Sequence, residues 1–153
     1  MKTNIKKDIY VTVPMLMDME LAVSKTAEAL ASMSQFSADQ IDEIRHAVIE
    51  ACINAIEHSQ SNDRKIYLRF SLYGDRLEIA VRDKGTGFEA EKVEKPDLRK
   101  KLNTGSRKRG WGLMLIQNLM DDVRIETESP GTSVVMVKQL TSEHSREGAH
   151  EGV

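Results

Sequence analysis

The sequence predicts an α+β fold, a two-layer sandwich in which helices pack on one face of a mixed, mostly antiparallel sheet. The first observation is the order of the predicted elements, which is β-α-α-β-β, a long loop, and then α-β-β. The second is a pair of short turns, Gly74-Asp75 and Ser129-Pro130-Gly131, each lying between two strand-like segments as in a hairpin. The third is a broad apolar arc along Ala38 to His58, which predicts a helix with one buried side.

The length and composition fit one domain with a buried core. The chain has 153 residues, of which 40% are hydrophobic and 30% are charged. Its formal net charge of −2 gives no overall attraction to nucleic acid or to a membrane surface. No apolar run approaches the ~20 residues of a membrane helix, and the start of the chain lacks the apolar stretch of a secretory signal. Cys52 is the only cysteine, which excludes an internal disulfide and a multi-cysteine zinc site, so we expect a cytoplasmic protein.

The N-terminal part predicts a strand followed by two helices. Ile5 to Val13 alternates loosely between apolar and polar residues and stops at Pro14, as an edge strand does. Pro14 is well placed just before a helix that covers about Leu16 to Met33. Ser37, with a glutamine three residues later, predicts a capping box that starts the second helix, Ala38 to about His58.

The rest of the chain predicts two hairpins and a helix, separated by a long polar segment. The expected elements are the strands Lys65–Tyr73 and Arg76–Arg82, a helix over about Leu113 to Asp122, and the strands Val123–Glu128 and Thr132–Gln139. The segment at about 88–109 is polar and longer than most loops, and such loops are usually functional lids or disordered. Residues 141–153 are polar and predict a flexible tail, which leaves 1–140 as the folded domain.

The second predicted helix ends in a group of polar residues that could carry chemistry. Glu50, Asn54 and His58 recur every four residues, on the side of the helix opposite its apolar arc. One interpretation is a solvated helix face. The other is a carboxylate able to act as a base, presented beside an amide able to bind a hard cation through oxygen. This segment alone leaves both interpretations open.

Two glycine-containing turns lie at the ends of predicted strands. Asp83-Lys84-Gly85-Thr86-Gly87 ends one strand, and Pro130-Gly131-Thr132-Ser133 begins the last one. Each alone fits an ordinary turn. In a binding site, Asp83 would accept a hydrogen bond from an exocyclic amine, while Gly85 and Gly87 would let a ligand approach the backbone.

The segment Gly105–Leu113 leads into the third predicted helix with glycines and positive charge. A helix N-terminus that carries Gly110 and Gly112 can hold an anion, because its unpaired N–H groups and its dipole favour phosphate. From Glu91 to Arg109 there are eight basic and three acidic residues, a local charge of +5. The combination favours phosphate binding, although the segment has neither a Walker A loop nor a G-x-G-x-x-G fingerprint after a strand.

In sequence order, these four motifs resemble the N, G1, G2 and G3 boxes of the Bergerat-fold (GHKL) ATPases, which include gyrase and histidine kinases. Within that superfamily the chain is most similar to the bacterial anti-sigma-factor serine/threonine kinases. The similarity lies in the stand-alone length, the E-A-x-x-N-A-x-x-H form of the first box, and the segments Arg109–Ile116 and Met120–Val123. It covers roughly Ile9 to Val137 and implies the histidine-kinase-like ATPase fold.

The resemblance implies ATP and Mg²⁺ as ligands and a role for each phosphate-side residue. Asn54 would hold Mg²⁺ through its side-chain oxygen, and Glu50 would take the proton from the attacking hydroxyl. The groups implied to meet the phosphates are Arg109, Gly110, Gly112 and the N–H of Leu113, with His58 near them. The segment at about 88–109 would be the lid over bound ATP. Trp111, between the two glycines, and the strongly basic lid are departures from the family pattern.

For the adenine end of the nucleotide, the resemblance implies that Asp83 accepts a hydrogen bond from the adenine amino group, with support from Thr132. Gly85 and Gly87 would make room for the base and the sugar. These assignments agree with the chemistry of phosphoryl transfer, which asks mainly for positioning and for neutralisation of charge.

The function implied is an ATP-dependent protein serine/threonine kinase that binds a sigma factor and phosphorylates a small anti-anti-sigma (STAS-type) protein. The resemblance also implies a homodimer, and we expect no direct binding to nucleic acid or to a membrane. The alternative is a non-catalytic module of the same fold, in which ATP only switches the affinity for a partner. Glu50 favours the kinase, because a module that only bound ATP would not require a base.

Overall fold

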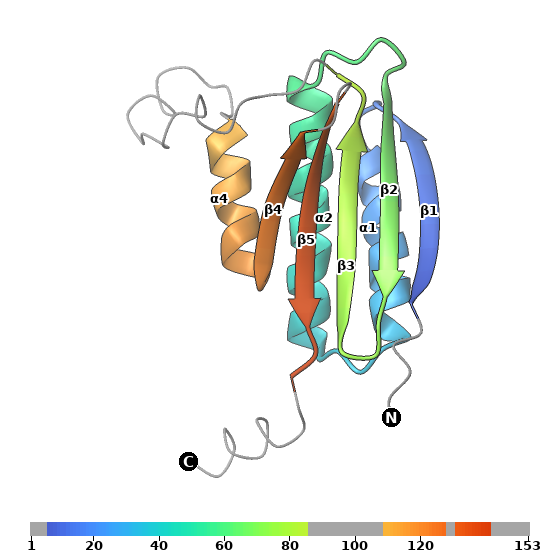
Figure 1. Cartoon of the computed structure of the whole chain (residues 1–153), viewed down its shortest axis with the longest axis vertical. Helices are drawn as coiled ribbons and strands as arrows, with labels where there is room; N and C mark the ends of the chain where they lie inside the picture. Colours follow the sequence, from blue (N-terminus) through green and yellow to red (C-terminus); the bar gives the residue numbers. More distant parts are fainter. Residues whose placement is uncertain (1–5, 86–108, 128–130, 142–153) are drawn as a thin grey trace.

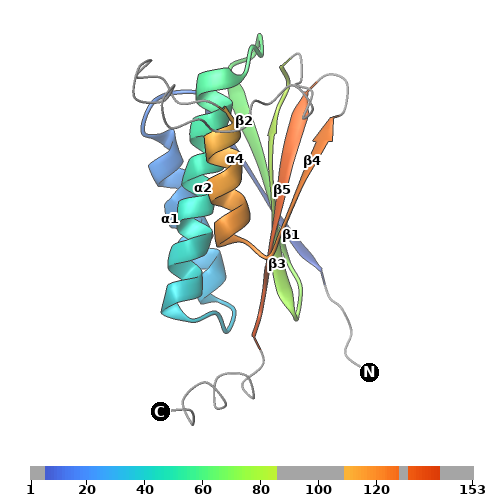
Figure 2. The same ribbon diagram turned by 90° about the vertical axis from the view of Figure 1, so that its left-hand side faces the viewer.

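The computed structural model describes residues 6–85, 109–127 and 131–141, and for 109–111 it describes the backbone alone. The elements in chain order are β1 (Lys7–Pro14), α1 (Met19–Ser32), α2 (Ala38–His58), β2 (Lys65–Leu72), β3 (Arg76–Asp83), α4 (Arg109–Leu119), β4 (Asp122–Thr127) and β5 (Thr132–Gln139). They form two layers, with the three helices on one face of a five-stranded sheet (Figures 1 and 2). The predicted α+β sandwich is confirmed.

The sheet has the strand order β1-β2-β3-β5-β4. Each neighbouring pair of these described strands is antiparallel. The described sheet is therefore antiparallel throughout, whereas the sequence predicted a mixed, mostly antiparallel sheet. The final hairpin joins the sheet through β5, which pairs with β3. This pairing brings the end of β3 beside the start of β5 and places Asp83 directly opposite Thr132.

Helix α2 lies between α1 and α4 and is the central helix of its layer. It begins and ends at the predicted residues. The capping box is present: Ser37 Oγ accepts from the Gln40 N–H at 3.1 Å, and Gln40 Oε1 accepts from the Ser37 N–H at 3.1 Å. Both bonds satisfy N–H groups that the helix itself leaves unpaired at its start.

The other two helices do not begin where the sequence predicts. Helix α1 begins at Met19, because β1 stays paired with β2 as far as Pro14 and Asp18 then adopts a left-handed backbone with φ of 76°. Helix α4 begins at Arg109, four residues before the predicted start, and ends at Leu119. Gly110 and Gly112 therefore lie in its first turn. Glycines weaken a helix, but packing on α2 supports this one.

The core lies between the two layers. Its largest fully buried side chains come from both layers and include Val23, Ile44, Val48, Ile66, Phe70, Leu77, Ile79, Ile116 and Met136. None of the described helices combines the length and the apolar character that a membrane span needs.

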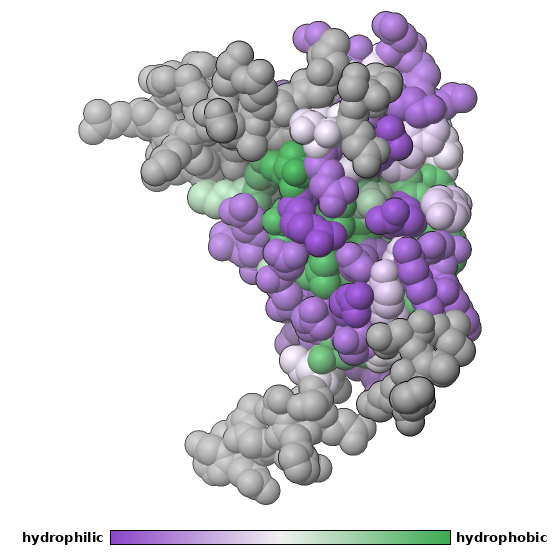
Figure 3. All heavy atoms as spheres, in the orientation of Figure 1, coloured by the Kyte–Doolittle hydropathy of each residue, from purple (hydrophilic) through white to green (hydrophobic). Residues whose placement is uncertain are grey.

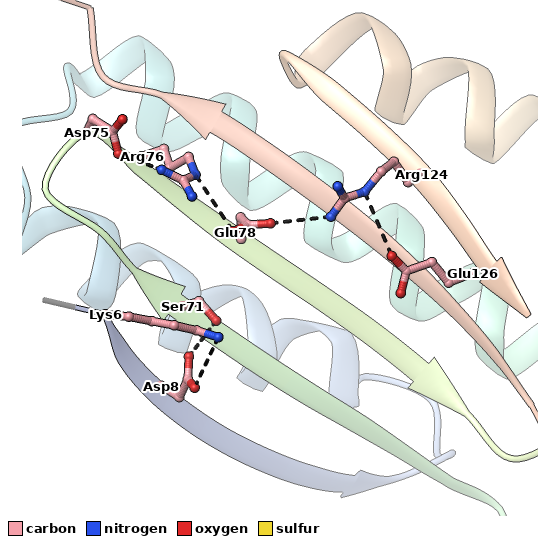
Figure 4. A network of polar contacts seen from close by, with 8 residues as sticks. All are labelled: Lys6, Asp8, Ser71, Asp75, Arg76, Glu78, Arg124 and Glu126. Atoms are coloured by element: carbon pink, nitrogen blue, oxygen red, sulfur yellow. Dashed lines mark hydrogen bonds and ion pairs between the residues drawn. The ribbon is translucent and has the colours of Figure 1, made fainter. Parts of the chain in front are cut away.

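The outer face of the sheet carries many hydrophilic residues with hydrophobic ones between them (Figure 3), and charged side chains of β3 and β4 contact one another on it (Figure 4). Arg124 of β4 reaches Glu78 of β3 across β5, with 3.4 Å between Nη2 and Oε1. Val135 and Val137 of β5 point to this face, because Met136 between them points into the core. They are nevertheless buried, which fits the long apolar stem of an arginine lying over them.

Candidate functional site

Asn54 of α2 lies against the first turn of α4. A Cβ atom placed on Gly112 would sit 3.2 Å from both Asn54 Oδ1 and Asn54 Nδ2, so the carboxamide touches the glycine backbone. Asn54 is only 7% exposed, but its carboxamide oxygen and nitrogen are not among the fully buried atoms that lack a partner in the described part of the chain. Its side-chain oxygen could therefore still bind a ligand such as a hard cation at this contact.

This placement changes the interpretation of the α2 motif. The spacing put Asn54 opposite the apolar arc, and a solvated face was one interpretation. The structure buries Asn54 because α4 packs on that edge of α2. The solvated-face interpretation is therefore wrong for Asn54.

Glu50 and His58 lie one turn before and one turn after Asn54, and both are partly buried. The His58 ring lies beside its neighbour in the chain, with 3.8 Å between Nε2 and Oε2 of Glu57. The spacing along α2 puts the carboxyl, carboxamide and imidazole groups on the same edge of the helix.

The second part of the site is built where β3 ends. Asp83 is 8% exposed, and its Oδ1 accepts two hydrogen bonds, from Ser59 Oγ at 3.0 Å and from the Gly85 N–H at 2.8 Å. Gly85 is held against this group so closely that a Cβ there would lie 2.9 Å from both Asp83 Oδ1 and Ser59 Oγ. No larger residue fits at position 85 without a shift of the carboxylate.

Thr132 completes this second part from the neighbouring strand. It is buried, and its Oγ1 has no hydrogen-bond partner among the residues described. Gly131, just before it, has φ of 122°, and a Cβ there would lie 2.1 Å from the Asp83 carbonyl oxygen. Only glycine allows this approach. The predicted pair of Asp83 and Thr132 is thus brought together, with an unpaired buried hydroxyl beside the carboxylate.

The start of α4 differs from the expectation at two residues. Arg109 belongs to the helix and not to the preceding segment, where the predicted lid of 88–109 placed it. Leu113 is the fifth residue of α4, so in a regular helix its N–H bonds to the carbonyl of Arg109 and is not among the unpaired groups. Its side chain is buried. The donors at this end are the N–H groups that precede Leu113. Gly87, the remainder of the lid, and 142–153 of the predicted tail lie outside the described residues.

Cys52 lies two residues before Asn54 but takes no part in this site. Its side chain is fully buried, and burial, with a smaller contribution from the charge of Glu20, raises the pKa of the thiol to about 12. A thiolate nucleophile is therefore excluded at neutral pH. The chemistry of the site rests on oxygen and amide groups.

The sequence did not single out Ser59, and it included Gly131 only as part of a turn. Ser59 follows α2 with no periodic pattern, and only the fold shows that it bonds to Asp83, which lies 24 residues further on. A glycine just before a strand did carry a signal for Gly131, but the signal is common to most hairpin turns.

Comparison with known proteins identifies the family of the chain. The model of the histidine kinase-like ATPase domain matches residues 16–138. The chain is 35% identical over 128 residues to the serine-protein kinase RsbW of Bacillus licheniformis, a match that covers 80% of this chain and 79% of that protein. It is 32% identical over 143 residues to RsbW of Halalkalibacterium halodurans, covering 92% of this chain and 88% of that one.

A solved structure shows the same fold. The RsbU and RsbW domains of Rv1364c from Mycobacterium tuberculosis match with a TM-score of 0.66 at 19% identity, over 89% of this chain and 33% of that one. The family is established by the sequence matches, which cover most of each relative, whereas the structural match shows only the shared fold. This chain belongs to the histidine kinase-like ATPase family, among the serine-protein kinases called RsbW.

Proposed function

We propose that this protein is an anti-sigma factor that uses ATP to phosphorylate a serine of a small anti-anti-sigma protein. The observation that carries the proposal is the contact between the Asn54 carboxamide and Gly112 in the first turn of α4. It joins an oxygen ligand for a cation to a helix start that favours phosphate, although the two lie far apart in the sequence.

The groups around this contact fit a magnesium–triphosphate. Among the described residues, no three His, Cys, Asp or Glu side chains gather into a metal-binding group. A Mg²⁺ ion here would take the Asn54 oxygen as a protein ligand and fill other positions with phosphate oxygens and water, which is usual for this ion. When bound, the ion would neutralise phosphate charge.

The remaining phosphate contacts would come from the first turn of α4 and from α2. The N–H groups of Gly110 and Gly112 and the charge of Arg109 would face the phosphates, and His58 would lie near them. At the other part of the site, Asp83 and the Thr132 hydroxyl would meet the adenine amino group, and Gly85 and Gly87 would give the nucleoside room.

Glu50 would serve as the general base, one turn before Asn54 on the same edge of α2. The serine oxygen of the partner forms a bond to the γ-phosphorus, and the bond from that phosphorus to ADP breaks. The serine proton passes to the Glu50 carboxylate. A base matters less in phosphoryl transfer than positioning does, so its removal should slow the transfer and leave nucleotide binding intact.

The partners proposed are a sigma factor and a STAS-type antagonist, both proteins of the cytoplasm. We also propose a homodimer. Leu16 and Met17, just before α1, and Leu21 in its first turn are each more than half exposed, and such apolar side chains often mark a protein interface. Sedimentation equilibrium of the purified chain should give twice the mass of one chain, and the mass of one chain alone would contradict the dimer.

The kinase is tested by incubating the protein with γ-labelled ATP and candidate antagonist proteins encoded near its own gene. We expect label on a serine of one candidate, and Glu50→Gln should bind ATP normally while losing most of the transfer, about 10²-fold or more. Phosphoryl transfer by Glu50→Gln at the wild-type rate would contradict the role of Glu50 as the general base. ATP binding without transfer to any candidate would favour the ATP-gated binding module.

A further inference from the structure

Ser59 is the residue of this site that has no assigned role. It is the C-cap of α2, where its N–H donates to the carbonyl of Ala55 at 3.0 Å. It is 8% exposed. Arg64 also holds it, donating from Nη1 to the Ser59 carbonyl at 3.1 Å. The backbone of Ser59 is therefore fixed from two sides.

The hydroxyl of Ser59 has a defined direction. Its Oγ accepts from the Ser61 N–H at 3.2 Å, so the proton of the hydroxyl is available for the other neighbour, Asp83 Oδ1, at 3.0 Å. The same Oδ1 atom accepts from the Gly85 N–H at 2.8 Å. Two donors thus meet one carboxylate oxygen, and no described residue donates a hydrogen bond to the other oxygen, Oδ2.

We propose that Ser59 is a positioning residue that sets the purine selectivity of the nucleotide site, which rests on the nucleotide-binding function proposed above. By fixing Oδ1, Ser59 and Gly85 hold the plane of the Asp83 carboxylate and leave Oδ2 as the acceptor for the base. An acceptor there takes a hydrogen bond from a 6-amino group and repels a 6-oxo group. A site built around one buried hydrogen bond rejects analogues that lack it, because its own polar group is then left unpaired.

A purely structural role for Ser59 predicts a different result. If the residue only capped α2, its loss would weaken the binding of every nucleotide by the same factor. If it orients Asp83, its loss selectively weakens ligands with a 6-amino group. The ratio of affinities for two purines therefore separates the two roles.

The experiment measures Mg²⁺-dependent binding of ATP, inosine triphosphate and purine riboside triphosphate by calorimetry. The proteins are the wild type, Ser59→Ala and the control Ser61→Ala, which removes a neighbouring buried hydroxyl that bonds to Met15 Sδ instead. We expect the wild type to prefer ATP, Ser59→Ala to reduce that preference about fivefold to tenfold, and Ser61→Ala to keep it. An unchanged ATP preference in Ser59→Ala would overturn the proposal, and so would equal binding of all three nucleotides by the wild type.

A second variant tests the orientation even if Ser59→Ala does not fold. In Asp83→Asn, the donors from Ser59 and Gly85 require the carbonyl oxygen of the amide at the Oδ1 position, which turns the NH₂ group toward the base. We expect this variant to prefer inosine triphosphate over ATP. A retained preference for ATP, or loss of all purine binding, would overturn the proposal. Failure of the wild type to bind any nucleotide would instead refute the proposed function itself.

Discussion

Replacing Gly112 with alanine should separate stability from function in this protein. The new methyl group would sit 3.2 Å from Asn54 Oδ1 and Nδ2 and 3.3 Å from its Cγ, which is tighter than most contacts of this kind. The carboxamide would have to move by a few tenths of an ångström. Asn54 is buried and has little room for that movement.

The effects on folding and on binding have opposite signs. An alanine in a helix is more favourable than a glycine by about 1 kcal/mol, which offsets the crowding, so the free energy of unfolding should stay within about 1 kcal/mol of the wild type. A Mg²⁺ ion tolerates little deviation from its ligand distance of about 2.0–2.1 Å. Displacement of its protein ligand should weaken Mg²⁺–ATP binding about tenfold, which corresponds to about 1.4 kcal/mol.

Calorimetry and urea denaturation of the same samples would measure both quantities. Gly74→Ala is the matched control, since a Cβ at Gly74 meets no atom within 4 Å and the residue lies in the β2–β3 turn at the other end of the sheet. We expect the control to bind like the wild type. Binding of Mg²⁺–ATP by Gly112→Ala at wild-type affinity would refute the link between Asn54 and the first turn of α4.

Two further predictions concern the core. The native state keeps a thiol proton on Cys52 that the unfolded chain loses near pH 9, because burial raises the pKa of Cys52 to about 12. The free energy of unfolding should therefore fall as pH rises from about 9 to 12, with a contribution of up to about 1.4 kcal/mol per pH unit from this group. Urea denaturation across this pH range should show a smaller fall for Cys52→Ala than for the wild type. An equal fall in the two proteins would contradict the prediction. Lys138 donates from Nζ to Glu43 Oε2 and to the Leu119 carbonyl, both at 2.6 Å, and its side chain is almost fully buried. Lys138→Met should lower the free energy of unfolding by about 1–3 kcal/mol. The control Lys25→Met, which breaks an exposed ion pair, should change it by less than about 0.5 kcal/mol. Similar losses of stability in both variants would contradict a special contribution from the buried ion pair.

Local signals in the sequence predicted some elements to the residue. The Ser37 capping box gave the start of α2, and the turn before Thr132 gave the start of β5. Both signals depend on a few neighbouring residues, so they predict the boundary of an element without knowledge of the tertiary packing. The fold class followed from the same hairpins and helices.

The start of α4 could not be predicted in this way. Two glycines around Trp111 indicate a break in the helix, because glycine is a poor helix former. The helix includes them because α4 packs on α2, where Gly112 leaves space for the Asn54 carboxamide. That information lies in another segment of the chain.

The candidate site shows the same division. The sequence indicated Asn54, Asp83 and Thr132 as residues of a site, through the order of four motifs. It could not show that Asn54 is buried, because helical periodicity does not reveal which second helix covers an edge. It could not show Ser59 either, since a single serine after a helix carries no pattern, and its bond to Asp83 exists only in the folded chain.

The most direct measurement is calorimetric titration of ATP into the wild type and into Asn54→Ala, each with Mg²⁺ and with a chelator. If the Asn54 oxygen holds the ion against the first turn of α4, Mg²⁺ should tighten ATP binding to the wild type at least tenfold and should have little effect on Asn54→Ala. An equal gain from Mg²⁺ in the two proteins would show that the ion is held elsewhere.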